Sequence, residues 1–145
     1  MVTFAEFETR AQTFDEKLRA DHEEAMRSRD CDDLVSELLK MYGELHDIVA
    51  TNPPSTPQVM VQACKAQLAF LEAGKAVDAF AKTFEVASFD IQRITELRRI
   101  MSDLFFAKGA MEATIRRLAE VTPDTLLPSD DFFARLRQRK CPTTS

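Results

Sequence analysis

Apolar residues recur along most of this chain at alternating spacings of three and four, the period that places side chains on one face of an α-helix. The first two stretches carry Phe4, Phe7, Ala11, Phe14 and Leu18, and then Leu34, Leu38, Met41, Leu45 and Ile48. The third carries Val59, Ala63, Ala66, Phe70, Ala73, Val77, Phe80 and Phe84, and the fourth Ile94, Leu97, Met101, Leu104, Met111, Ile115 and Leu118. The pattern therefore predicts four amphipathic helices.

Capping residues and prolines indicate where two of these helices begin. Thr3 and Glu6 have the spacing of a capping box, in which each side chain accepts a hydrogen bond from the other residue's backbone N–H. Thr56 followed by Pro57 is a second start signal, because the fixed φ of proline suits the first helical position. The Pro-rich segment 52–57 is the expected linker between the second and third helices.

These elements predict an all-α fold, an up-down bundle of about four long helices with a short C-terminal helix. The short helix would begin near Ser129 and carry Phe132, Phe133 and Leu136. Residues 1–140 are expected to form a single helical-bundle domain, and residues 141–145 a disordered tail. A chain of 145 residues is long enough to bury a core without disulfide or metal support.

The third helix carries more apolar surface than a peripheral helix needs. Beside its main stripe runs a second one, Met60, Cys64, Leu68 and Leu71. A helix that is apolar over much of its circumference lies in the centre of a bundle or at an interface. We therefore take these four residues, together with Phe132 and Phe133, as interface candidates, and we expect self-association or a helical protein partner.

Composition narrows the classes of partner and compartment. Residues 1–50 carry 13 acidic and six basic side chains, and this acidic half would repel phosphate backbones, so no nucleic-acid partner is expected. The sequence has neither a basic-apolar leader nor an apolar run long enough for a membrane span. Its three cysteines lack paired spacing, which is typical of reduced thiols. We expect a cytoplasmic or nuclear protein that is not secreted and has no transmembrane segment.

One set of acidic residues resembles a metal-binding family motif. Glu23 and Glu24, followed later by Glu44 and Asp47, occupy positions similar to those of the Glu-Glu-x-x-Glu and Glu-x-x-Asp motifs of the all-α nucleotide pyrophosphohydrolases of the MazG kind, although Arg27 replaces the third glutamate of the first motif. Carboxylates one turn apart share a helix face and suit a hard cation. The resemblance implies Mg²⁺-dependent hydrolysis of nucleoside triphosphates, with these four carboxylates as metal ligands.

Other catalytic signatures are absent from the sequence. With only three glycines, the chain has no Gly-rich phosphate loop, and it has neither a G-x-S-x-G nor a C-x-x-C motif. We therefore expect no catalytic residue, no cofactor-binding residue and no cofactor. The function that the sequence favours is a non-catalytic protein–protein interaction or scaffold module. The alternatives are the Mg²⁺-dependent hydrolase and a carrier of apolar small ligands.

Overall fold

Both predicted start signals form helix caps in the computed structural model, which describes residues 2–20, 31–82, 91–121 and 135–136. The Thr3 N–H donates to Glu6 Oε1 at 3.3 Å, and the Glu6 N–H donates to Thr3 Oγ1 at 3.1 Å. The Val59 N–H donates to Thr56 Oγ1 at 3.3 Å. Each cap satisfies backbone donors that have no partner within the helix. The capping box and the Thr-Pro start are therefore confirmed.

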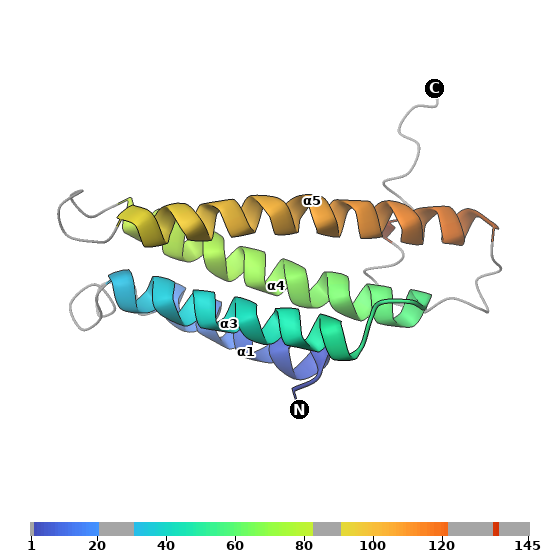
Figure 1. Cartoon of the computed structure of the whole chain (residues 1–145), viewed down its shortest axis with the longest axis horizontal. Coiled ribbons are helices and arrows are strands. Elements are labelled where there is room, and N and C mark those ends of the chain that lie inside the picture. Colours follow the sequence, from blue (N-terminus) through green and yellow to red (C-terminus); the bar gives the residue numbers. More distant parts are fainter. Residues whose placement is uncertain (1, 21–30, 83–90, 122–134, 137–145) are drawn as a thin grey trace, which may run out of the picture.

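Four helices account for nearly all of the described chain: α1 (Phe4–Ala20), α3 (Cys31–Thr51), α4 (Pro57–Ala81) and α5 (Ile91–Val121). They run alternately in opposite directions along the long axis of the molecule (Figure 1). An ion pair of 2.6 Å between Arg98 Nε and Asp78 Oδ1 joins the start of α5 to the end of α4. The prediction of an all-α, up-down bundle is confirmed for these helices.

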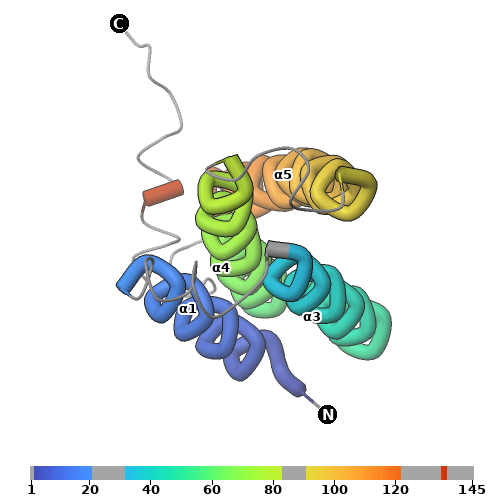
Figure 2. Tube along the Cα trace, turned by 90° about the vertical axis from the view of Figure 1, so that its left-hand side faces the viewer, coloured from blue at the N-terminus to red at the C-terminus, as the bar shows by residue number. Residues whose placement is uncertain are grey.

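Helix α4 occupies the centre of the bundle. Viewed along the axis, it lies among α1, α3 and α5 (Figure 2), and it packs against all three. Alanine is frequent on its buried faces, where a small side chain lets a neighbouring helix approach closely. The two apolar stripes of this helix thus face neighbouring helices of the same chain.

The main hydrophobic core is built by all four helices, with α4 in the middle and Ile94, Leu97, Ile100 and Leu104 supplied by α5. Its largest side chains include Phe4, Phe7, Phe70 and Phe80, none of which is more than 2 % exposed. The Tyr42 ring leans against Phe70, with 5.9 Å between the ring centroids. Burying one such side chain contributes about 1.5–3 kcal/mol. All the predicted stripe residues of α1 and α3 belong to this core, although Phe14 is only half-buried.

A glycine permits the close contact between α4 and α5. A Cβ atom added to Gly74 would lie 2.7 Å from Met101 Sδ, closer than van der Waals contact allows. The absence of a side chain therefore lets Met101 pack directly on the α4 backbone.

A second, smaller cluster lies towards the other end of α4 and α5. It consists of Val61, Cys64, Ile115 and Leu136. Leu136 is 1 % exposed, so this C-terminal residue packs against α4 and α5 at this end of the bundle. Phe132, Phe133 and the predicted tail, residues 141–145, lie outside the described residues, as does most of the expected C-terminal helix. None of the described helices is both long and apolar enough to cross a membrane.

Candidate functional site

A buried ion pair interrupts the apolar face that α5 turns towards α4. Lys108 Nζ donates to Glu112 Oε1 at 2.9 Å, and the two residues are only 8 % and 7 % exposed. They lie one turn apart on the same helix, and the heptad stripe of α5 passes through the lysine. Burying either charge alone would be expensive, so each makes the burial of the other tolerable.

Two polar groups of α4 lie on the face that meets this ion pair. Gln67 is 4 % exposed, and its Oε1 accepts no hydrogen bond from the described residues. The pKa of the Cys64 thiol is raised to about 12, mainly by burial and also by the Glu112 carboxylate, while the Lys108 ammonium opposes the change. The α4–α5 interface therefore has a polar section, which we call the polar seam: Cys64, Gln67, Lys108 and Glu112.

The chemistry available to the polar seam is limited. The thiolate is the nucleophilic form of cysteine, and the Cys64 thiol holds its proton throughout the neutral range. The Lys108 ammonium and the Glu112 carboxylate neutralise each other. The unsatisfied Gln67 oxygen costs about 1–3 kcal/mol. These groups lie within the packing of α4 and α5, and they do not have the geometry of a nucleophile beside a base.

Of the four predicted metal ligands, the structure describes Glu44 and Asp47. Neither belongs to a cluster of potential metal ligands among the described residues. The Arg10 guanidinium donates to both oxygens of Glu44, at 2.5 and 3.3 Å, joining α1 to α3. This hydrogen bond raises the pKa of Arg10. Asp47 is exposed, and Glu23 and Glu24 lie outside the described residues. No cluster of three potential metal-ligating side chains occurs within the described ranges.

A small cleft opens beside the Arg10–Glu44 pair. It has a volume of about 170 Å³ and is lined by Arg10, Phe14, Glu37, Lys40, Met41 and Glu44. Two cations and two carboxylates face it, so its lining carries no net charge. A carrier of apolar ligands needs a predominantly apolar cavity. This cleft does not supply one.

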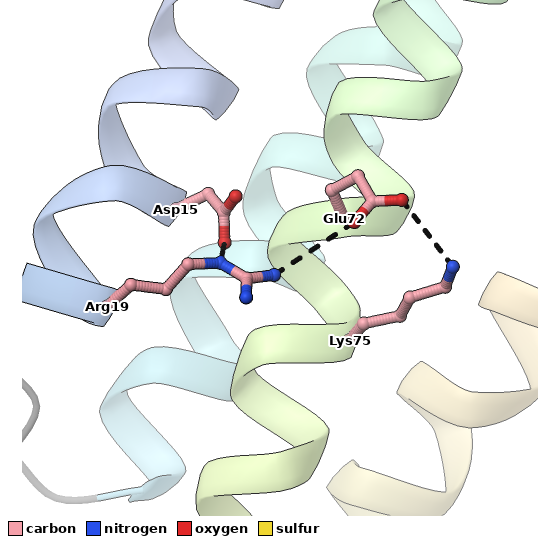
Figure 3. A network of polar contacts seen from close by, with 4 residues as sticks. All are labelled: Asp15, Arg19, Glu72 and Lys75. Atoms are coloured by element: carbon pink, nitrogen blue, oxygen red, sulfur yellow. Dashed lines mark hydrogen bonds and ion pairs between the residues drawn. The ribbon is translucent and has the colours of Figure 1, made fainter.

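A polar network on the surface joins α1 to α4. It is a chain of successive contacts from Asp15 and Arg19 on α1 to Glu72 and Lys75 on α4 (Figure 3). Arg19 Nε lies 2.7 Å from Asp15 and its Nη2 lies 4.0 Å from Glu72, which Lys75 approaches to 3.5 Å. Arg19 and Lys75 are exposed and Asp15 and Glu72 are half-buried, and surface pairs of this kind contribute about 0–1 kcal/mol. The network joins α1 to α4 with a small gain in stability.

The α4 residues predicted as interface candidates are mostly covered within the chain. Cys64 is fully buried, Leu71 is 4 % exposed, and Met60 is half-buried against the smaller cluster. Only Leu68 is exposed, at 37 %. Ile115 of α5 and Leu136 pack with Cys64 and Met60 in the smaller cluster, so these two positions are covered within the chain.

Among the residues that the structure describes, the most exposed aromatic side chains lie on α5. Phe105 is 59 % exposed and Phe106 is 70 % exposed. Their rings meet edge to face, with 5.8 Å between the centroids and an angle of 81° between the planes. The predicted apolar stripe of α5 includes neither residue. Two adjacent phenylalanines directly after Leu104 cannot both lie on the buried stripe of one helix. Their adjacency could therefore have predicted an exposed aromatic side chain.

Neither a family model, nor a curated protein, nor a solved structure matches this chain. A function for the chain must therefore be argued from its own residues. Among the described residues, the outer surface of α5 around Phe105 and Phe106 is the feature that packing within the chain leaves unexplained.

Proposed function

We propose that this protein is a non-catalytic interaction or scaffold module, and that it binds a protein partner through the outer face of α5. The observation that supports the proposal most strongly is the exposure of Phe105 and Phe106. Leaving a phenylalanine in water forgoes about 1.5–3 kcal/mol per side chain. Aromatic side chains are enriched at the centres of protein interfaces, where a partner recovers this free energy.

The residues around the phenylalanines suit a helical partner. Gly109 and Ala110 are exposed on the same stretch of α5. Small side chains let another helix approach closely, while Phe106 projects far enough to fill a gap on the partner. Arginines and acidic residues lie at both ends of this stretch. An apolar centre with a charged rim is the arrangement found in specific protein interfaces.

Photo-crosslinking in living cells tests this proposal. A photoreactive phenylalanine analogue is placed at Phe106, and in a control variant at His46, which is exposed on α3. We expect a discrete protein adduct from position 106 alone, and we expect the replacement Phe105→Ser to reduce it. Adducts of equal yield from both positions, or none from position 106, would overturn the proposal.

A further inference from the structure

A second heptad seam runs along the outer face of α5, opposite the one that packs on α4. Its positions alternate in spacings of four and three. It consists of Arg99, Asp103, Phe106, Ala110, Ala113, Arg117 and Glu120, which we call the outer seam. Ala113 is half-buried and the other six are exposed. The Arg99 and Asp103 side chains pair with each other at 3.5 Å and remain 66 % and 69 % exposed.

The charges of the outer seam are arranged symmetrically about Ala110. Asp103 lies seven residues before it and Arg117 lies seven residues after it. Arg99 and Glu120 lie at almost equal distances further out. If two copies of α5 meet in opposite directions around Ala110, each Asp103 faces Arg117 and each Arg99 faces Glu120. In a parallel pair, by contrast, each charged residue of the seam would face the same residue of the other copy, and the two equal charges would repel each other.

The apolar centre of the seam has the same symmetry. In the antiparallel arrangement, Phe106 of one copy lies over Ala113 of the other, and the two Ala110 residues face each other. A large residue opposite a small one is the knob-and-hole complementarity by which helices pair. Small residues at the centre permit a short distance between the helix axes. Shape and charge therefore favour the same arrangement.

We propose that the partner of this face is a second copy of the same chain, docked antiparallel through the outer seam around a two-fold axis at Ala110. The proposal rests on the proposed function and names its partner. A two-fold axis makes every contact occur twice, so a self-complementary seam contributes each of its pairs in duplicate. A surface that binds an unrelated protein does not need this symmetry.

Charge reversal within the seam tests the proposal. Sedimentation equilibrium gives the dimer dissociation constant of the full chain and of Asp103→Arg, Arg117→Asp and the double variant. Each single change makes two attractive pairs repulsive, which we expect to weaken dimerisation roughly tenfold. The double variant restores opposite charges in an antiparallel dimer, and we expect its dissociation constant to return towards that of the unmodified chain. Glu96→Gln, on the side of α5, is the matched control and should have little effect.

The outcomes of this experiment separate the two proposals. A chain that stays monomeric at all accessible concentrations, or a double variant as weak as the single ones, would overturn the antiparallel dimer. If photo-crosslinking from position 106 then gave an adduct with a different protein, the interaction function would stand and only the identity of the partner would be wrong. Circular dichroism of each variant confirms that a loss of association does not reflect a loss of folding.

Disulfide crosslinking tests the position of the axis independently. In a background with Cys31→Ser and Cys141→Ser, Ala110→Cys should form a covalent dimer under mild oxidation, because a disulfide requires Cα atoms within about 7 Å. Ala107→Cys is the control, one turn away on the same helix and exposed, but outside the seam. Equal crosslinking of both variants would contradict a specific seam, and so would a failure of Ala110→Cys to crosslink.

Discussion

On its inner face, α5 buries Ile94, Leu97 and Ile115 completely, whereas on its outer face Phe106 is 70 % exposed. Both faces follow the same heptad spacing, so periodicity alone does not distinguish them. They differ in what covers them: α4 packs on the inner face, and no described part of the chain covers Phe106. The comparison indicates that the inner face stabilises the fold, and that the outer face is free to serve recognition.

The inner face is itself divided. Towards the start of α5, apolar side chains meet α4, and Met101 packs against Gly74. Further along, Lys108 and Glu112 introduce charges into the same interface. This pair forms within α5 itself, so it is satisfied in any register of α5 against α4, whereas removing its two charges from water opposes their burial. We therefore expect the polar seam to make the α4–α5 interface less stable than a purely apolar one.

The largest expected effect comes from breaking the buried ion pair on one side. Glu112→Leu leaves the Lys108 ammonium buried without the carboxylate that it pairs with, and we expect the free energy of unfolding to fall by about 3–5 kcal/mol. The double variant Lys108→Met/Glu112→Leu removes both charges and should lie within about 1 kcal/mol of the unmodified chain, or above it. Urea unfolding followed by circular dichroism measures both. If the free energy of unfolding fell equally in the single and double variants, an unpaired buried charge would not be the cause of the loss.

The Cys64 thiol should be strongly protected in the folded chain. Its pKa is raised to about 12, so at pH 8.5 the folded chain holds far less thiolate than the unfolded one. We expect alkylation of this thiol to be slower by at least about a hundredfold than in the unfolded chain. Mass spectrometry of time points resolves it from Cys31 and Cys141. Rapid alkylation under native conditions would place the thiol outside the interface.

The same thiol makes a pH-dependent contribution to stability. The folded chain keeps a proton that the unfolded chain loses above the ordinary thiol pKa of 9.0, up to a folded value of about 12. This contribution is therefore fully present below pH 9 and is lost as the pH rises through this window. Cys64→Ala should show a shallower decline of stability between pH 9 and 11 than the unmodified chain, by urea unfolding at each pH. If the stability of both proteins declined equally with pH, the Cys64 thiol would not be the cause of the decline.

A smaller effect compares two glycines inside helices. An added Cβ meets nothing within 4 Å at Gly43, so Gly43→Ala should stabilise the chain by up to about 1 kcal/mol through helix propensity. At Gly74 the same change pushes against the Met101 side chain, and the displacement should offset that gain. Thermal unfolding of the two variants measures the difference. A larger stabilisation at Gly74 than at Gly43 would mean that α5 does not pack closely there.

The sequence was sufficient to predict which residues form the core of α1 and α3. Their stripes repeat without interruption, and each helix has one apolar face, so Leu34, Leu38 and Phe7 had only one direction in which to be buried. The caps at Thr3 and Thr56 could be predicted as well, because capping depends on residues close together in the chain.

The candidate site could not be predicted in the same way. Periodicity identifies the apolar faces of α4, but it does not tell whether a helix of the same chain or a second protein covers Cys64 and Leu71. The sequence shows Lys108 and Glu112 one turn apart, but only the folded structure shows that both are buried and paired. The outer seam mixes charged and small residues, so Phe106 gave little signal of a second face.

The most direct test of the account compares Leu97→Ala with Phe106→Ala at a concentration where the chain is monomeric. Both changes remove a large apolar side chain from α5, one from each face. By urea unfolding, Leu97→Ala should lower the free energy of unfolding by about 2–5 kcal/mol, and Phe106→Ala should change it by no more than about 0.5 kcal/mol. A loss at Phe106 comparable to that at Leu97 would show that the chain covers its own outer face, and would contradict the division of α5 into a folding face and a recognition face.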